Sequence, residues 1–197
     1  IFTSSVGVYK PTKKTLYENS SIDPISNYGL NKYLSEKLII NYLMLAKIPY
    51  VIFRLFNVYG PNQDLDNLNQ GILSIYLSYI LRNKPIIIKG KVNRTRDFVY
   101  IDDVINALIS CINNSKLNNN IFFISSGNSI SIKNLINLLL KFSSKKKNYP
   151  IKIKGDTKFN INYIKGNYDK LRLVTGWKPS TNLANGIKKM YDYYDAK

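Results

Sequence analysis

A tyrosine and a lysine spaced four residues apart, Tyr28 and Lys32, are the side chains in this sequence best suited to proton transfer. They open a long segment rich in apolar residues, and on a helix positions i and i+4 lie on one face, one turn apart. A phenol ordinarily has a pKa of about 10, and an ammonium group one turn away favours its anion. The pair can therefore act as a general base near neutral pH, which a lone tyrosine cannot do.

The same spacing occurs twice more, starting at Tyr9 and at Tyr33. Pro11 lies inside the first of these pairs, which makes a helix there unfavourable. Tyr33 follows Tyr28 by five residues, roughly 140° round the helix, so those two pairs cannot face one site. For each pair the alternative is a surface tyrosine beside a solvated lysine.

A helix over residues 28–46 must carry the pair, with Ser26 or Asn27 as its N-terminal cap. Four leucines recur along it at near-helical spacing and are expected to lie mostly in the core: Leu30, Leu34, Leu38 and Leu45. The other expected elements are strands at 1–3 and 50–54, a helix at 71–81, a strand at 85–89, a helix from 102 to about 113, a strand at 121–124, a helix that Ser131 caps and that runs to about 142, and a terminal helix at 182–194.

Six short motifs span nearly the whole chain. In order they are Ser4-Ser5-x-x-Val8-Tyr9, Tyr28-x-x-x-Lys32, Arg54-Leu-Phe-Asn57-Val-Tyr-Gly-Pro61, Arg96-Asp97-Phe98-Val99-Tyr100-Ile-Asp-Asp103-Val104, Ser126-Gly127 followed by Ser131-Ile132, and Gly176-Trp177-Lys178-Pro179. With these motifs in register, the chain resembles the extended short-chain dehydrogenase/reductase family, the NAD-dependent nucleotide-sugar epimerases and dehydratases.

The resemblance implies an α/β fold: the C-terminal part of a Rossmann-type parallel sheet with a smaller mixed α/β substrate-binding lobe. Residues 1–60 would belong to the NAD-binding domain. Residues 61–197 would form the substrate-binding lobe, interleaved with returning Rossmann elements at about 97–125.

No stretch matches the Gly-x-Gly-x-x-Gly that binds the NAD pyrophosphate in this family. We therefore expect the chain to be the C-terminal part of a longer protein. Ahead of Ile1 we expect several βα units, on the order of 100 residues at ~30 per βαβ unit. Alone, such a piece is expected to bind NAD weakly and to aggregate through its unpaired strand edge and exposed apolar faces.

The implied activity is 4-epimerisation of a nucleotide-sugar, a UDP-hexose, through a transient 4-keto sugar. Tyr28 would take the proton from sugar O4 while the C4 hydride passes to NAD. Lys32 would hold the nicotinamide ribose and lower the pKa of Tyr28. Ser5 would polarise O4, with Ser4 as the competing hydroxyl and a turn-capping role as the alternative.

The resemblance also implies binding residues. Leu55 and Phe56 would line the nicotinamide, Asn57 would contact the nucleotide-sugar, Arg96 would grip the diphosphate, and Asp156 would bind the nucleotide ribose. The alternative for Asn57 is a turn residue before Gly60-Pro61, and for Arg96 a surface ion pair with Asp97. The family's arginine three residues before the aspartate is replaced here by Ile153, so Lys152 or Lys154 would have to substitute.

Two positions bear on the class of reaction. The family's dehydratases carry an acid and a base directly after the active-site threonine, whereas this chain has Val6 and Gly7 there. Neither side chain can move a proton, which disfavours 4,6-dehydration. Another nucleotide-sugar reductase or dehydratase of the family remains an alternative, as does a non-catalytic fragment or a subunit completed by a separate chain.

Composition and charge narrow the remaining classes of function. The net charge is +17, with 24 lysines against 5 arginines among 197 residues. The lysines are scattered and no nucleic-acid motif accompanies them, so no nucleic-acid partner is expected; a basic binding module is the rival. Some positive charge would suit an anionic nucleotide-sugar.

The chain has no histidine and one cysteine, which excludes an intrachain disulfide, histidine triads and histidine-metal sites. Asp102 and Asp103 suit the start of a helix, and no metal site is expected. No apolar run approaches 18 residues, so no membrane partner is expected, and the reducing cytoplasm is the default compartment. The resemblance implies a homodimer of the full-length protein, in which the helix at 28–46 packs against its copy.

Overall fold

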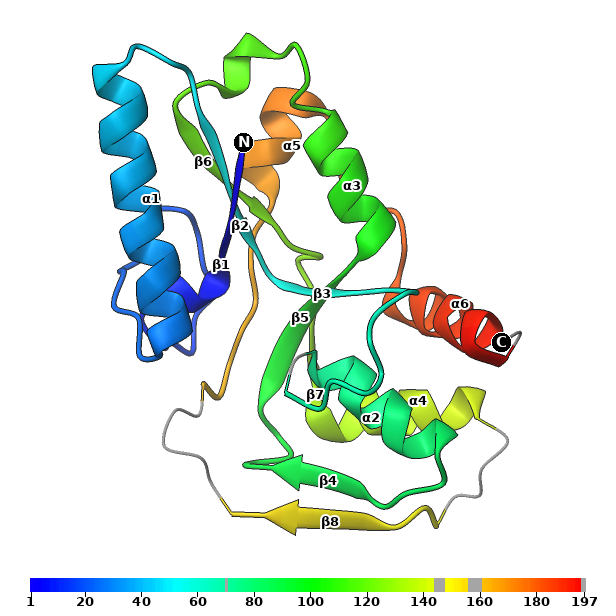
Figure 1. The fold of residues 1–197 in the computed structure, drawn as a ribbon. Helices are drawn as coiled ribbons and strands as arrows, with labels where there is room; N and C mark the ends of the chain where they lie inside the picture. The colour runs from blue at the N-terminus through cyan, green and yellow to red at the C-terminus, as the bar shows by residue number, and fades with distance from the viewer. Residues whose placement is uncertain (70, 144–147, 156–160, 196–197) are drawn as a thin grey trace.

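The structure is a computed structural model that describes residues 1–69, 71–143, 148–155 and 161–195 (Figure 1). Its strands are β1 (Phe2–Ser5), β2 (Val51–Leu55), β3 (Asn57–Tyr59), β4 (Ile86–Lys89), β5 (Thr95–Tyr100), β6 (Asn120–Ile124), β7 (Ser129–Ser131) and β8 (Ile151–Lys154). Its α-helices are α1 (Asn27–Leu45), α2 (Ile72–Leu81), α3 (Ile101–Ile109), α4 (Ile132–Phe142), α5 (Asp169–Thr175) and α6 (Leu183–Asp195). Parallel strands alternating with helices confirm the predicted α/β class.

Three strands form an all-parallel sheet in the order β1-β2-β6. Its central strand is apolar apart from Arg54, and Ile52 and Phe53 are fully buried. Parallel strands covered on both faces are typically such continuous apolar runs. The sheet therefore has helices on both sides: α1 on one, and α3 with α5 on the other (Figure 1).

Different side chains of β2 face the two sides, because successive residues of a strand point in opposite directions. Phe53 packs with Phe122 of β6, Ala107 of α3 and Leu171 of α5 in one apolar cluster. Arg54 points the other way, where it meets Glu36 of α1.

A second group of elements lies at the other end of the molecule (Figure 1). Strands β3, β5 and β7 form one small sheet, and β4 pairs with β8 in another. Helices α2, α4 and α6 share the core of this lobe, where Leu77, Leu135, Ile187 and Met190 are all fully buried. Strand β3 follows β2 after a single residue, so the chain passes directly from the parallel sheet into this lobe.

The expectation that the leucines of the 28–46 helix lie mostly in the core is wrong. The exposed fractions of Leu34, Leu38 and Leu45 are 50%, 71% and 78%. The helix instead buries Glu36, of which 1% is exposed. Leu34 and Leu38 each lie two residues, roughly 200°, from Glu36, so tying this carboxylate to the sheet turns the leucines outward.

Most other predicted elements are present with ends shifted by one or two residues. The main exception is the helix expected to reach about residue 113, because α3 ends at Ile109. Ser26 is the cap of α1, with its hydroxyl accepting a hydrogen bond from the Gly29 amide at 3.1 Å. Ser131 caps α4 in the same way. Within the described ranges, each helix is too short or too polar to cross a lipid bilayer.

Candidate active site

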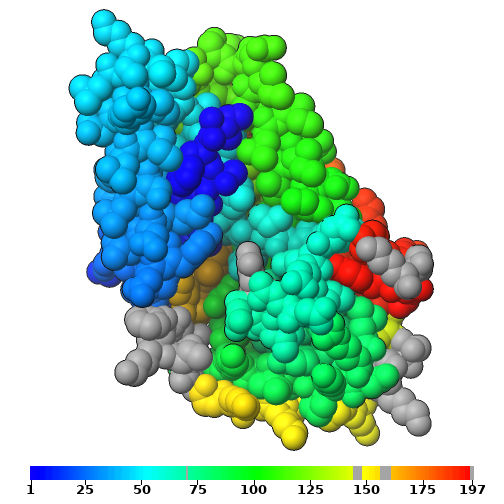
Figure 2. All heavy atoms as spheres, viewed as in Figure 1, coloured from blue at the N-terminus to red at the C-terminus, as the bar shows by residue number. Residues whose placement is uncertain are grey.

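A cavity of about 860 Å³ opens where β1, β2 and the start of α1 meet the loop before α2. Figure 2 shows this face of the molecule hollowed between the blue N-terminal segment and the teal residues near α2. The lining includes seven predicted site residues, Ser5, Tyr28, Lys32, Leu55, Phe56, Asn57 and Arg96. The eighth, Asp156, lies outside the described residues. The cavity lies at the C-terminal ends of parallel strands, where ligands bind in open α/β folds.

Ser5 ends β1 and caps the short 3₁₀ turn that follows, Val6–Val8. Its hydroxyl oxygen accepts a hydrogen bond from the Gly7 amide at 3.0 Å. The turn-capping role weighed from the sequence is therefore present, and it leaves the hydroxyl hydrogen available to a ligand in the cavity. The competing hydroxyl, Ser4, also lines the cavity, and it is 3% exposed.

The first turn of α1 presses against this 3₁₀ turn, and a glycine permits the approach. A Cβ on Gly29 would lie 2.1 Å from the carbonyl oxygen of Gly7, so no larger residue fits without moving the helix. Tyr28, the preceding residue, keeps 60% of its surface exposed and lines the cavity. Close packing at Gly29 therefore brings the phenol of Tyr28 to the segment that carries Ser5.

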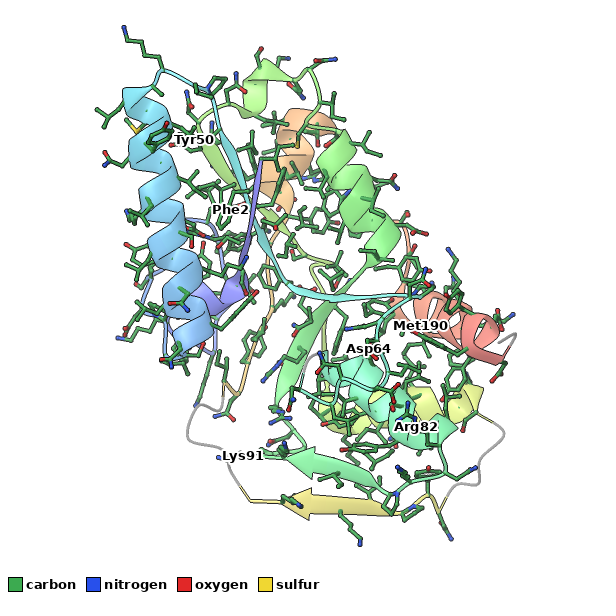
Figure 3. The ribbon with its side chains drawn as sticks, viewed as in Figure 1. Phe2, Tyr50, Asp64, Arg82, Lys91 and Met190 are labelled. Atoms are coloured by element: carbon green, nitrogen blue, oxygen red, sulfur yellow. The ribbon has the colours of Figure 1, made fainter. Side chains whose placement is uncertain are left out.

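Lys32 lies one turn further along α1, as predicted. Its ammonium donates a hydrogen bond to the carbonyl of Thr3 at 2.9 Å, and it lies 5.1 Å from the ring centroid of Phe2. Phe2 is labelled in Figure 3 on β1, the strand beside α1. Lys32 is thus held at the junction of helix and strand by a carbonyl and an aromatic face.

Asn57 joins the parallel sheet to the second lobe. Its amide nitrogen donates a hydrogen bond to the carbonyl of Asp97 at 2.8 Å. This bond fixes the side chain beside the cavity with its amide oxygen as the remaining acceptor.

Arg96 lies on β5 and reaches the cavity from the opposite side. Its guanidinium donates to the carbonyls of Thr95 at 2.7 Å and Ile161 at 2.8 Å. Burial, assisted by the neighbouring Arg94, lowers the pKa of Arg96 to about 10, which leaves it charged at neutral pH. No ion pair joins Arg96 to Asp97 among the described contacts, so the alternative weighed from the sequence does not hold.

Asp97 instead ties three segments together beneath the cavity. Its carboxylate accepts hydrogen bonds from the amide and hydroxyl of Ser126, at 2.8 and 2.6 Å, and from the amide of Gly166 at 3.1 Å. It is fully buried, and burial raises its pKa although these hydrogen bonds oppose the shift. The sequence showed Asp97 only as the neighbour of Arg96.

A buried polar cluster behind the site was also missed from the sequence. Arg54 forms two hydrogen bonds with the carboxylate of Glu36, at 2.9 and 2.6 Å, and a third with the hydroxyl of Tyr9. Two signals could have indicated it. Glu36 follows Lys32 by four residues, and Arg54 is a lone charge inside an apolar strand.

Known proteins resemble this chain in sequence and in fold. Residues 1–125 match the family described as the NAD dependent epimerase/dehydratase family. A Methanocaldococcus jannaschii protein with the provisional name UDP-glucose 4-epimerase is 34% identical over 201 residues, which cover 98% of this chain and 62% of that protein.

Solved structures also match nearly the whole chain. The UDP-glucose 4-epimerase of Thermotoga maritima, with UDP-glucose, has a TM-score of 0.90 and 28% identity over 99% of this chain and 62% of its own. The UDP-glucuronic acid 4-epimerase of Bacillus cereus, in complex with UDP-glucuronic acid and NAD, has a TM-score of 0.90 and 27% identity over 98% of this chain and 60% of its own. The chain thus spans less than two thirds of the length of these relatives. As its motifs predicted, it belongs to the NAD-dependent epimerase/dehydratase family.

Proposed function

We propose that the full-length protein is an NAD-dependent nucleotide-sugar epimerase that inverts C4 of a UDP-hexose through a transient 4-keto sugar. The observation that carries this proposal is the shared cavity. It brings a phenol, an ammonium and a hydroxyl from β1 and α1 opposite an amide and a guanidinium from β3 and β5. Acid–base groups at one end and a cation at the other suit a sugar joined to a diphosphate.

Each residue then has a role that its chemistry allows. Tyr28 would accept the proton of sugar O4 and return it, with Lys32 one turn further along the same helix beside it in the cavity. Ser5 would donate its free hydroxyl hydrogen to O4, because its oxygen already accepts from Gly7. Arg96, charged and half-buried, would hold the diphosphate, and Asn57 would contact the nucleotide-sugar.

The residues of this chain fit the nicotinamide end of NAD. The ammonium of Lys32 can bind ribose hydroxyls, and the apolar residues Leu55 and Phe56 line the same cavity at the end of β2. When bound, NAD supplies the reversible acceptor and donor of hydride. A glycine-rich pyrophosphate loop is not found in the sequence, so firm NAD binding is proposed for the full-length protein.

The turn after Ser5 argues against dehydration as the activity. Val6 and Gly7 form that turn with Val8, and neither side chain can act as acid or base. A dehydratase would need both functions at these positions, as the family's dehydratases have them.

The test is to incubate the full-length protein with NAD and UDP-glucose and to follow the sugar by proton NMR. We expect UDP-galactose to accumulate to equilibrium, with no loss of the 6-hydroxyl. A 4-keto-6-deoxy product would identify a dehydratase. Oxidation of NADH, supplied with a 4-keto nucleotide-sugar in a parallel assay, would identify a reductase. Absence of turnover with UDP-hexoses would contradict the proposal.

We also propose that the full-length protein is a homodimer through α1. The helix presents an exposed apolar face that includes Leu34, Leu38, Tyr42 and Leu45. An apolar face of this kind is typical of an interface between proteins. Sedimentation of the full-length protein should give a dimer and that of Leu38→Glu a monomer, whereas an unchanged mass for the variant would contradict this interface.

A further inference from the structure

The buried pair formed by Glu36 of α1 and Arg54 of β2 lies outside the lining of the cavity. Both residues lie on elements that contribute other side chains to that lining. The two side chains are 1% and 2% exposed. They are joined by two parallel hydrogen bonds, Nε to Oε1 at 2.9 Å and Nη2 to Oε2 at 2.6 Å. A bidentate pair of this kind fixes the relative orientation of two groups as well as their distance.

Glu36 belongs to the same stripe of α1 as the proposed catalytic residues. Tyr28, Lys32 and Glu36 follow at intervals of four residues, so each lies one turn after the last with a drift of roughly 40°. Fixing the rotation of the helix at Glu36 therefore fixes the direction in which Lys32 and Tyr28 point.

Arg54 also contacts the segment that follows β1, next to the turn that Ser5 caps. Its Nη1 donates to the hydroxyl of Tyr9, and its guanidinium carbon lies 4.8 Å from the centroid of that ring. Tyr9 directly follows the 3₁₀ turn that Ser5 caps, and its hydroxyl donates in turn to the carbonyl of Glu18 at 3.0 Å. In the parallel register, Arg54 is also the partner of Ser4 on β1.

We propose that Glu36 and Arg54 are positioning residues: their bidentate pair, braced by Tyr9, holds α1 and the end of β1 in the rotation and register that bring Tyr28, Lys32 and Ser5 to one cavity. The inference rests on the proposed function for its catalytic consequence. The geometrical part concerns only this chain.

A purely stabilising role would make a different prediction. Replacing both members of a buried ion pair by apolar residues of similar volume is often neutral for stability, whereas removing one leaves a buried charge unpaired. An apolar pair packs without fixing the angle between helix and strand. The double variant Glu36→Leu/Arg54→Met therefore separates stability from positioning.

The first readout needs no turnover. Acetylation of individual lysines, followed by mass spectrometry well below the melting temperature, reports whether Lys32 keeps its bond to Thr3. In the double variant we expect a melting temperature near that of the wild type and a Lys32 modification rate roughly tenfold higher, since a hydrogen bond to a charged group is lost. Lys37, exposed on the same helix, is the internal reference. Asn41→Gln, also on the exposed side of α1, is the matched control and should leave both rates unchanged.

The second readout is the steady-state kinetics of turnover in the full-length protein. We expect kcat of the double variant to fall by roughly tenfold or more with KM little changed, because Tyr28 and Lys32 are no longer held in the orientation that catalysis needs. The single variants Glu36→Leu and Arg54→Met should melt at lower temperature than the wild type. Arg54→Lys keeps the charge but cannot make the bidentate contact, so its Lys32 modification rate and its kcat should not return to the wild-type values.

A stable double variant with wild-type Lys32 reactivity would overturn the positioning role. A wild-type protein that turns over no nucleotide-sugar would count against the proposed function instead, and the lysine readout would still decide the geometry.

Discussion

The ammonium of Lys32 donates to the backbone carbonyl of Thr3 across 2.9 Å, which joins α1 to β1 at the cavity itself. A lysine on a surface helix would ordinarily sample many rotamers in water, and ordering it costs side-chain entropy. Here the Lys32 side chain is ordered when the protein folds, so its ammonium is in place before a ligand binds. The same junction depends on how closely α1 can approach the turn after Ser5.

Gly29 permits the close approach of α1 to the turn after Ser5, and Gly29→Ala should disturb it. The new Cβ would lie 2.1 Å from a backbone oxygen of Gly7, which cannot swing aside as a side chain could. We expect the free energy of unfolding to fall by about 3 kcal/mol, the upper part of the range for overpacking. Urea unfolding measures the change.

Gly155→Ala is the control for this variant, because an added Cβ there meets no described atom within 4 Å. It should change stability by less than ~0.5 kcal/mol. Equal effects at the two glycines would show that the contact between α1 and the 3₁₀ turn is not close in solution.

Arg96 should carry much of the affinity for the diphosphate. Replacing it by methionine keeps the length of the side chain and removes its charged donors, which are worth about 1.5–3 kcal/mol. Calorimetric titration with UDP should show Kd rising by roughly 10- to 150-fold. Because the pKa of Arg96 is lowered only to about 10, the loss should persist across pH 6–8.5.

Arg82→Met tests whether that loss is specific. Arg82, labelled in Figure 3, follows the end of α2 and forms an exposed ion pair with Asp66. UDP affinity should be unchanged in this variant. An Arg96→Met protein that binds UDP as tightly as Arg82→Met would contradict the role of Arg96.

Asp97 should make stability depend on pH in a defined direction. Its folded pKa is raised above 3.8, chiefly by burial, so the folded state holds more protons than the unfolded state between these two values. The stability that Asp97 contributes is therefore greatest below 3.8 and falls as pH rises through the folded pKa.

Asp97→Asn isolates this effect, because other groups cancel in the difference between the two proteins. At pH 7 the variant should lose about 1–3 kcal/mol, since an amide NH₂ replaces one acceptor oxygen among buried donors. The difference should grow between pH 7 and pH 4.5. A difference that shrinks towards acid pH would contradict the assigned shift, and Asp66→Asn, exposed, should show neither effect.

The sequence predicted the parts of the fold that depend on local pattern. Buried strands such as β2 and the capped helices α1 and α4 follow from apolar runs and from Ser26 and Ser131. The seven site residues now found around one cavity were identified by motif order. Their roles and the domain boundaries remain predictions.

What the sequence did not reveal depends on partners distant along the chain. The leucines of α1 have the spacing of a core stripe, yet the bond between Glu36 and Arg54, 18 residues apart, decides which face is buried. Short strands such as β7 and β8 exist only because β5 and β4 offer them an edge. No local periodicity encodes such pairings.

The central claim is that Tyr28 is the acid–base residue of a nucleotide-sugar epimerase. The direct test is turnover of UDP-glucose by the full-length Tyr28→Phe protein, beside Tyr17→Phe as the control, since Tyr17 is also exposed and does not line the cavity. We expect Tyr28→Phe to lower kcat by at least about 100-fold, the usual share of a positioned acid–base group, with the UDP Kd and the melting temperature unchanged. Tyr17→Phe should match the wild type. Turnover by Tyr28→Phe at the wild-type rate would contradict the account.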